Sequence, residues 1–281
     1  MENRCLYPAQ LAQYRAFLEE EARACGTIEQ YLRAVRLFMQ WLDGAPVSRQ
    51  TVQRWSQWLL DDGYAPVTVN AMLAALNGLF HFLGWDDCRC RYLRVQRRLF
   101  RSAERTLHRE EYVRLLQTAQ RGGKRGLALL METICSTGIR VSEVKAITVE
   151  AVQQGRADIQ LKGKIRTILI PKKLGQKLLR HARAQKIAAG EIFITNDGKS
   201  LSRCRIWLEM KRLAKAADVA PSKIFPHNLR HLFATVYYYT HKDISHLADL
   251  LGHSSIETTR IYLSTPGSEC LQQLEQLRLI L

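Results

Sequence analysis

Residues 251–262 read LGHSSIETTRIY, and the rest of the chain is organised around the spacing in this stretch. A leucine-rich segment with helical periodicity comes before it, and Gly252 suits the end of that helix because it lacks a Cβ. Ser254 and Glu257 have the spacing of a capping box, which predicts that a second short helix begins at Ser254. The pattern therefore predicts two helices joined by a turn, with a histidine in the turn and a tyrosine at the far end.

This histidine and tyrosine, His253 and Tyr262, have two interpretations. Tyrosine is common at a helix end, so a helical hairpin with an incidental tyrosine is one of them. In the other, the tyrosine is a nucleophile. Its hydroxyl has an ordinary pKa of about 10, so it then needs a base or surrounding cations to react near neutral pH. The partners supplied by the rest of the chain decide between the two.

The charge of the chain is strongly positive, with 42 Lys and Arg against 26 Asp and Glu in 281 residues, a formal net charge of +16. Such a surplus is typical of proteins that bind a polyanion, most often nucleic acid, and the alternative is a merely basic surface. Residues 1–104 hold 13 arginines, no lysine and 11 acidic residues, so most of the excess lies in residues 105–281. This step in composition indicates two units with different tasks.

Membrane, secreted and ATP-driven classes of protein are not indicated. No run reaches the roughly 18 apolar residues of a membrane span, and Met1–Cys5 is not followed by the apolar core of a signal peptide, so we expect a cytoplasmic location. Cys88 and Cys90 lack the second pair of a zinc site, and scattered free thiols suit a reducing compartment. Residues 122–125, GGKR, lack the flanking residues of a phosphate-binding loop.

Residues 8–104 show apolar residues at helical spacing, which predicts four short helices with an aromatic core. Seven arginines then fall within residues 89–105, which predicts a flexible basic linker that reaches a nucleic-acid backbone, with a simple surface connector as the alternative. Arginines off the apolar faces are candidate phosphate contacts, and a solvated face is the alternative for each. The candidate DNA-binding residues are Arg33, Arg36, Arg94, Arg97 and Arg98.

Residues 137–144, TGIRVSEV, place Arg140 between two apolar neighbours just after a helix-ending glycine. An unpaired charge there is costly, so Arg140 needs an anion, either Glu143 or a ligand phosphate. Residues 158–171 alternate in polarity around a Lys-Gly-Lys turn, which predicts a β-hairpin with Lys162 and Lys164 at its tip. A hairpin tip of this kind can carry a charge into a DNA groove.

Residues 226–231, PHNLRH, predict the start of a helix with His227 and Arg230 on one face. His227 and His231 also have the spacing of a zinc-binding pair. The metalloprotease pattern needs a glutamate where Asn228 stands, and no third ligand is evident, so we expect no metal.

The second unit thus offers a set of groups suited to a phosphodiester. Guanidinium forks bind phosphate oxygens bidentately, and fixed cations stabilise the charge that builds as the phosphorus becomes pentacoordinate. A histidine can take the proton of the tyrosine, and a hairpin lysine can protonate the leaving alkoxide. The candidate catalytic residues are Arg140, a hairpin lysine (Lys162 or Lys164), His227, Arg230, His253 and Tyr262.

Three boxes, residues 137–144, 227–230 and 251–262, resemble those of the tyrosine recombinases in identity, order and spacing. This is the family of phage integrases and Xer-like site-specific recombinases, and the resemblance covers nearly the whole chain. It implies a mainly α fold with a small β-hairpin in the C-terminal domain, arranged as a two-domain DNA clamp. The implied domains are a helical core-binding domain in residues 1–100, the end of the basic linker in 101–106, and a catalytic domain with a C-terminal docking helix in 107–281.

The resemblance also implies a mechanism. Tyr262 would attack double-stranded DNA to form a 3′-phosphotyrosyl link, and strands would be exchanged through a Holliday junction without ATP, metal or another cofactor. Arg140 and Arg230 would hold the phosphate, with His227 as general base and His253 hydrogen-bonded to the phosphate. A type IB topoisomerase-like nicking and rejoining enzyme and a catalytically silent DNA-binding relative are the alternatives.

The hairpin departs from the family, which usually has a pattern close to GKGxKxR where residues 161–166 read LKGKIR. Lys162 matches the family's general acid better, and Lys164 stays open as the alternative. Glu143 stands where the family has a supporting acid. The amphipathic tail from Ser268 is implied to dock in trans within a homotetramer on two DNA sites. The chain has no room for an arm-binding domain, so we expect a simple Xer-like or mobile-element recombinase.

Overall fold

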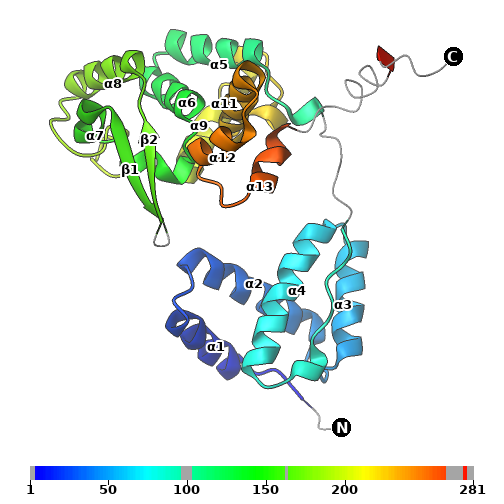
Figure 1. Ribbon diagram of the computed structural model, residues 1–281. Helices are drawn as coiled ribbons and strands as arrows, with labels where there is room; N and C mark the ends of the chain where they lie inside the picture. Colours follow the sequence, from blue (N-terminus) through cyan, green and yellow to red (C-terminus); the bar gives the residue numbers. More distant parts are fainter. Residues whose placement is uncertain (1–3, 96–102, 162–163, 264–274, 277–281) are drawn as a thin grey trace. The chain divides into compact units, whose positions relative to one another are not determined.

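The computed structural model describes residues 4–95, 103–161, 164–263 and 275–276, and the chain divides into two compact units, Met1–Arg97 and Arg98–Leu281 (Figure 1). The described residues are mostly helical with one small antiparallel sheet, as the sequence predicts. No helix among them is long and apolar enough to cross a membrane.

The first unit is built from helices whose buried faces carry large aromatic side chains. Tyr14, Phe38, Trp55 and Phe80 are fully buried, and the rings of Phe38 and Trp55 meet edge to face at 5.1 Å between centroids. Such pairs add to the free energy gained by burying apolar area, so this cluster is the core of the unit. The helices are α1 (Pro8–Glu20), α2 (Cys25–Leu42), α3 (Arg49–Asp61) and α4 (Pro66–Phe82).

The chain after α4 is tied to that helix by two asparagine side chains. The Asn77 side chain donates to the carbonyl of Cys90 (2.9 Å) and accepts from its N–H (3.0 Å). Asn70, two turns earlier on α4, pairs with the backbone of Leu93 in the same way at 2.9 and 2.7 Å. The predicted flexible basic linker is therefore wrong for residues 89–93, because these amides satisfy the backbone groups and dock the segment on the helix.

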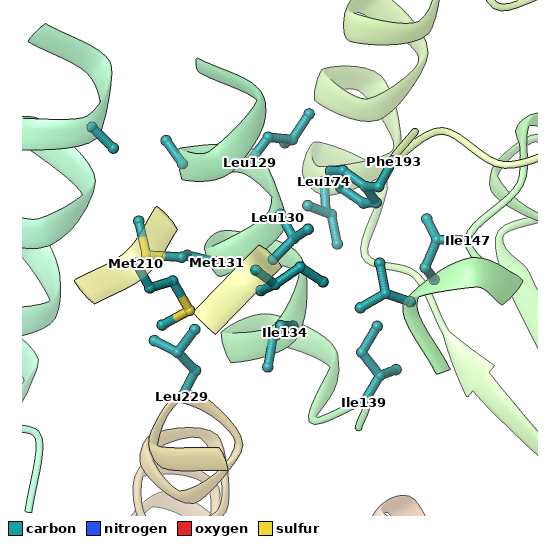
Figure 2. Packing of buried hydrophobic residues seen from close by; sticks show 14 of the residues in the cluster. Leu129, Leu130, Met131, Ile134, Ile139, Ile147, Leu174, Phe193, Met210 and Leu229 are labelled. Carbon is teal, nitrogen blue, oxygen red and sulfur yellow. The ribbon is translucent and has the colours of Figure 1, made fainter. Parts of the chain in front are cut away.

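The second unit surrounds α6, whose residues Leu130, Met131 and Ile134 lie in the middle of its hydrophobic core (Figure 2). The predicted hairpin is present, with register from Arg156↔Leu169 to Leu161↔Lys164. Its elements are α5 (Arg109–Arg121), α6 (Arg125–Thr137), a 3₁₀ turn (Val141–Ala146), α7 (Val149–Gln154), β1 (Arg156–Leu161), β2 (Lys164–Leu169), α8 (Lys172–Ala184), α9 (Arg203–Lys211), α10 (Ala214–Ala217), α11 (Pro226–His241), α12 (Ile244–Leu251), α13 (Ile256–Arg260) and a 3₁₀ turn (Ile261–Leu263).

Two glycines end the helices that deliver the predicted boxes. Gly138 ends α6 with φ of +65°, and a Cβ on it would lie 2.5 Å from Phe233. Gly252 ends α12 with φ of +63°, as the sequence predicts. The predicted cap at Ser254 is wrong by one residue: the Oγ of Ser255 accepts from the N–H of Glu257 at 3.2 Å, because Ser255 has the extended conformation that an N-cap needs.

Candidate active site

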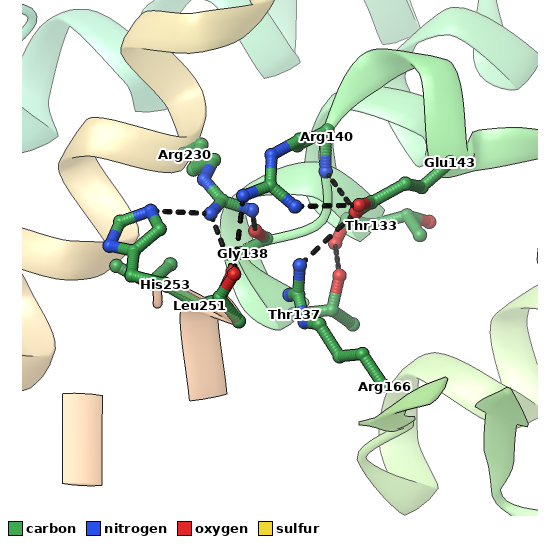
Figure 3. Close-up of polar contacts among 10 residues, drawn as sticks. Thr133, Thr137, Gly138, Arg140, Glu143, Arg166, Arg230, Leu251 and His253 are labelled. Carbon is green, nitrogen blue, oxygen red and sulfur yellow. Dashed lines mark hydrogen bonds and ion pairs between the residues drawn. The ribbon is translucent and has the colours of Figure 1, made fainter. Parts of the chain in front are cut away.

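The candidate site residues of the second unit come from four segments, and Figure 3 shows Arg140, Glu143, Arg230 and His253 beside the ends of α6 and α12. Arg140 and Glu143 lie at the 3₁₀ turn after α6, and His227 and Arg230 lie on the first turns of α11. His253 follows α12, and Tyr262 lies in the 3₁₀ turn after α13. The structure thus brings together five of the six predicted catalytic residues and the predicted supporting acid Glu143.

Arg230 is the most buried charged group of the site, with 1% of its surface exposed. Its Nη1 donates to the carbonyl of Gly138 (2.5 Å), and its Nη2 donates to the carbonyl of Leu251 (2.7 Å). These carbonyls are at the C-terminal ends of α6 and α12, where the helix dipole favours a cation. Burial lowers the pKa of Arg230, and the nearby Arg140 lowers it further. Arg230 therefore holds two helix ends together while it carries charge into the site.

Arg140 pairs with Glu143, which is one of the two candidate anions for its charge. Its Nη1 lies 2.8 Å from Oε1 of Glu143, and its backbone N–H donates to Oε2 at 2.8 Å. Glu143 is buried, whereas 37% of the Arg140 side chain is exposed. The pair leaves part of the guanidinium exposed, so Arg140 can bind a phosphate while it stays paired with the Glu143 carboxylate.

His253 is held in one tautomer by its neighbours. A guanidinium donates and never accepts, so Nε2 of His253 accepts the hydrogen bond from Arg230 at 3.0 Å. Nδ1 then carries the proton and donates to Oγ1 of Thr259 at 2.8 Å. Burial, and next the charge of Arg230, lower the pKa of His253 to about 4, so the ring is neutral near pH 7. To donate to a phosphate, Nε2 must release Arg230 and gain a proton.

Tyr262 is buried among three histidine rings of its own chain. Its hydroxyl lies 3.4 Å from Nε2 of His227, and its ring stacks on His253 at 5.6 Å with 9° between the planes. The His231 ring packs against it at 5.3 Å. Candidate nucleophile and candidate base are therefore adjacent within a single chain. His231 contributes to this packing, and the described residues contain no group of three His, Cys, Asp or Glu that could hold a metal.

Other predicted residues are less completely placed. Arg33, Arg36 and Arg94 are exposed. Lys162 lies outside the described residues, and Lys164 lies in β2 with a side chain that is not described. Arg97, Arg98 and the predicted docking helix from Ser268, apart from residues 275–276, also lie outside the described residues.

Arg166 is a member of this cluster that the sequence analysis did not single out. Its Nη1 lies 3.3 Å from Oε2 of Glu143, on the opposite oxygen from the Arg140 guanidinium (Figure 3). Two signals were available. The family's hairpin pattern ends in an arginine that matches Arg166, and alternate residues of an extended segment share a face, so Arg166 shares one with the buried Ile168 and Ile170. An arginine in a row of core positions needs a buried anion.

Comparisons with known proteins agree with this arrangement. The family model described as Phage integrase family matches residues 105–266, and the model described as Phage integrase, N-terminal SAM-like domain matches residues 11–87. Tyrosine recombinase XerA of Thermococcus kodakarensis is 28% identical over 277 residues, which cover 96% of this chain and 95% of that protein. Tyrosine recombinase XerD of Xanthomonas campestris is 29% identical over 270 residues, covering 86% and 83%.

Solved structures share the fold. A lambda integrase tetramer bound to a Holliday junction matches with a TM-score of 0.75 and 19% identity, covering 93% of this chain and 78% of that one. A XerA recombinase crystal structure matches with a TM-score of 0.53 and 20% identity, covering 97% and 99%. Because the first family model spans more than half of the sequence and includes all the residues of the site, this chain belongs to the phage integrase family.

Proposed function

We propose that this protein is a site-specific DNA recombinase that cleaves and rejoins double-stranded DNA through a 3′-phosphotyrosyl link to Tyr262. The observation that carries the proposal is the 3.4 Å contact between the Tyr262 hydroxyl and His227, beside the buried charge of Arg230. A phenol is a poor nucleophile near neutral pH because it keeps its proton. A neighbouring base can remove that proton, and neighbouring cations stabilise the phenolate. The named relatives are tyrosine recombinases, which agrees with this chemistry.

Each group has a task in this reaction. The bond from the Tyr262 oxygen to phosphorus forms as the bond from phosphorus to the 5′ oxygen breaks, and the tyrosyl proton passes to His227. Arg140 and Arg230 hold the nonbridging oxygens, where charge builds. The leaving 5′ oxygen takes a proton from a hairpin lysine. The phosphotyrosyl link conserves the energy of the phosphodiester, so attack by a 5′ hydroxyl of a partner strand completes the exchange without ATP.

We assign the two parts of the chain different tasks on DNA. Residues 1–100 form the core-binding domain, and residues 107–281 form the catalytic domain, joined through residues 101–106. Arg33, Arg36, Arg94, Arg97 and Arg98 meet the phosphate backbone. The protein acts in the cytoplasm as a tetramer on two DNA sites, with the C-terminal helix docked in trans. The shared fold with a lambda integrase tetramer on a Holliday junction supports this assembly.

The direct test is capture of a covalent adduct on a nicked suicide duplex. Tyr262→Phe removes the nucleophile and is expected to abolish adducts while DNA binding is unchanged. Tyr239→Phe, on the exposed side of α11, is the control and is expected to form adducts like the wild type. Adducts that persist in Tyr262→Phe would refute the proposal and direct attention to Tyr237, Tyr238 and Tyr239.

A second candidate function follows from the contact between Tyr262 and His227 of the same chain. Tyr262 already contacts His227 without a partner subunit, which suits a type IB topoisomerase-like enzyme that nicks and rejoins alone. Two differently labelled duplexes distinguish the functions: a recombinase yields products that join both labels, whereas a topoisomerase-like enzyme relaxes a supercoiled plasmid and never joins the labels.

A substrate whose leaving group needs no proton can identify the general acid. A 5′-sulfur leaves without a proton, so a substrate with a 5′-bridging sulfur rescues loss of the acid. We expect Lys162→Ala to slow cleavage of the ordinary duplex and to recover on the sulfur substrate. Recovery of Lys164→Ala, with no effect of Lys162→Ala, would assign the role to Lys164.

A further inference from the structure

Arg166 contacts two groups, Glu143 and Gly252, that are hydrogen-bonded to Arg140. Its guanidinium shares the buried Glu143 carboxylate with Arg140: the two guanidinium groups contact different oxygens, and the backbone N–H of Arg140 also donates to the oxygen that Arg166 contacts. Its side chain also lies against Gly252, where a Cβ would be 2.3 Å from Cδ of Arg166. The carbonyl of Gly252 in turn accepts a long hydrogen bond from Nη2 of Arg140 at 3.5 Å. Arg166 therefore touches both groups that hold the Arg140 guanidinium.

The surroundings of Arg166 are unfavourable for its charge. Only 12% of its side chain is exposed, and its Nε and Nη2 are buried without an acceptor within the described residues. Burial, together with Arg230 and Arg140, lowers its pKa to about 10, although Glu143 opposes the shift. A buried donor without an acceptor destabilises the folded state. Stability alone would favour an apolar side chain of similar length at this position.

We propose that Arg166 is a positioning residue for the strand-cleavage reaction: it fixes Glu143 and the Gly252 turn so that the Arg140 guanidinium meets the scissile phosphate in one orientation. This inference rests on the proposed function. Without the Arg166 charge, Glu143 keeps its two hydrogen bonds from Arg140 but loses its contact from the hairpin side, so the pair of Arg140 and Glu143 is held less firmly against the Gly252 turn. A misplacement of about 1 Å in a group that holds the reacting phosphate can cost about 10²-fold in rate.

Arg166→Met tests the proposal, because it keeps an unbranched apolar stem against Gly252 and removes the guanidinium. We expect its melting temperature to match or exceed that of the wild type, its affinity for the target duplex to be close to normal, and its cleavage of bound duplex to fall about 10²-fold. Arg156→Met is the matched control, because it removes the same charge from the exposed start of the same hairpin. It is expected to cleave like the wild type.

A double-mutant cycle shows whether Arg166 acts through Arg140. In an Arg140→Lys background the guanidinium contact with Oε1 of Glu143 is already lost, so Arg166→Met should lower the cleavage rate little further. Losses that simply multiply would show that Arg166 acts independently of Arg140 and would overturn the proposal.

The outcomes of these experiments separate the proposal from its alternatives. Arg166→Met that cleaves bound duplex at the normal rate overturns the proposal, whatever its melting temperature. Should Arg166→Met be poorly folded, Arg166→Lys replaces it: the charge remains while the fork is lost, and an intermediate loss that vanishes in the Arg140→Lys background supports the proposal. A multiplicative loss refutes it. Tyr262→Phe on the same gel separates this result from the proposed function, which fails if that variant still forms adducts.

Discussion

Gly252→Ala perturbs the turn between α12 and His253, and the structure gives the size of the effect. Gly252 has φ of +63°, and holding alanine in the left-handed region costs about 1–2 kcal/mol. The added Cβ would also lie 2.3 Å from Cδ and 3.0 Å from Nε of Arg166. Because Glu143 holds the Arg166 side chain, the clash adds to the backbone cost, and we expect the total loss of unfolding free energy to exceed 2 kcal/mol.

Gly155→Ala is the matched control, since Gly155 also ends a helix with positive φ (+72°) and has no atom within 4 Å of an added Cβ. It should show the backbone cost alone. Urea unfolding gives the two free energies, and suicide-substrate cleavage at saturating protein gives the two rates. We expect Gly252→Ala to lose more stability and to cleave more slowly, and Arg166→Ala to restore part of the stability. Equal stability losses with equal cleavage rates would refute the close contact between Gly252 and Arg166.

Three other variants probe the remaining contacts. The lowered pKa of His253, about 4 against an ordinary 6.5, means that between these values the unfolded chain binds a proton that the folded chain does not. Stability from this group is complete above pH 6.5 and decreases toward pH 4, and His253→Gln should flatten that part of a pH series of urea titrations. Glu143→Gln leaves two arginines without their carboxylate, so thermal unfolding should show a loss of about 3–5 kcal/mol, and an unchanged melting temperature would contradict the buried pair. Asn77→Leu should release the segment after α4, which hydrogen exchange at residues 89–93 would detect as faster exchange, and unchanged protection there would show that the asparagine does not hold it.

The parts of the site that could be predicted from the sequence were those placed by local backbone conformation. Gly138 and Gly252 end helices because only glycine takes their positive φ without strain, and each is followed within two residues by a candidate site residue, Arg140 or His253. Helical spacing placed His227 and Arg230 on one face of α11. Local sequence was therefore sufficient to find the side chains that meet there.

What the sequence did not predict depends on contacts between distant segments. Nothing in the run after α4 marks it as docked, because the asparagines that hold it lie 13 and 23 positions earlier in the chain. Arg166 reads as one more charge beside the hairpin lysines until the strand face is known to be buried. The cap lies at Ser255, one residue later than predicted, because Ser255 has the extended backbone of an N-cap, which the spacing of serine and glutamate in the sequence does not reveal.

The hydrogen bonds of Arg230 limit how a phosphate can bind in this site. Three of its donors are used within the protein, by the carbonyls of Gly138 and Leu251 and by His253. A phosphate oxygen that reaches Nη2 has to replace the Leu251 carbonyl or the His253 ring, and the carbonyl is fixed at a helix end, so the ring is the partner that can leave. Its Nε2, no longer facing a donor and now beside an anion, can then take up a proton. Arg140, with part of its guanidinium exposed, needs no such exchange. Phosphate binding should therefore begin at Arg140. A phosphate oxygen that takes the place of the His253 ring at Nη2, rather than binding Nε of Arg230, which has no acceptor within the described residues, converts His253 from an acceptor within the protein to a donor toward the DNA.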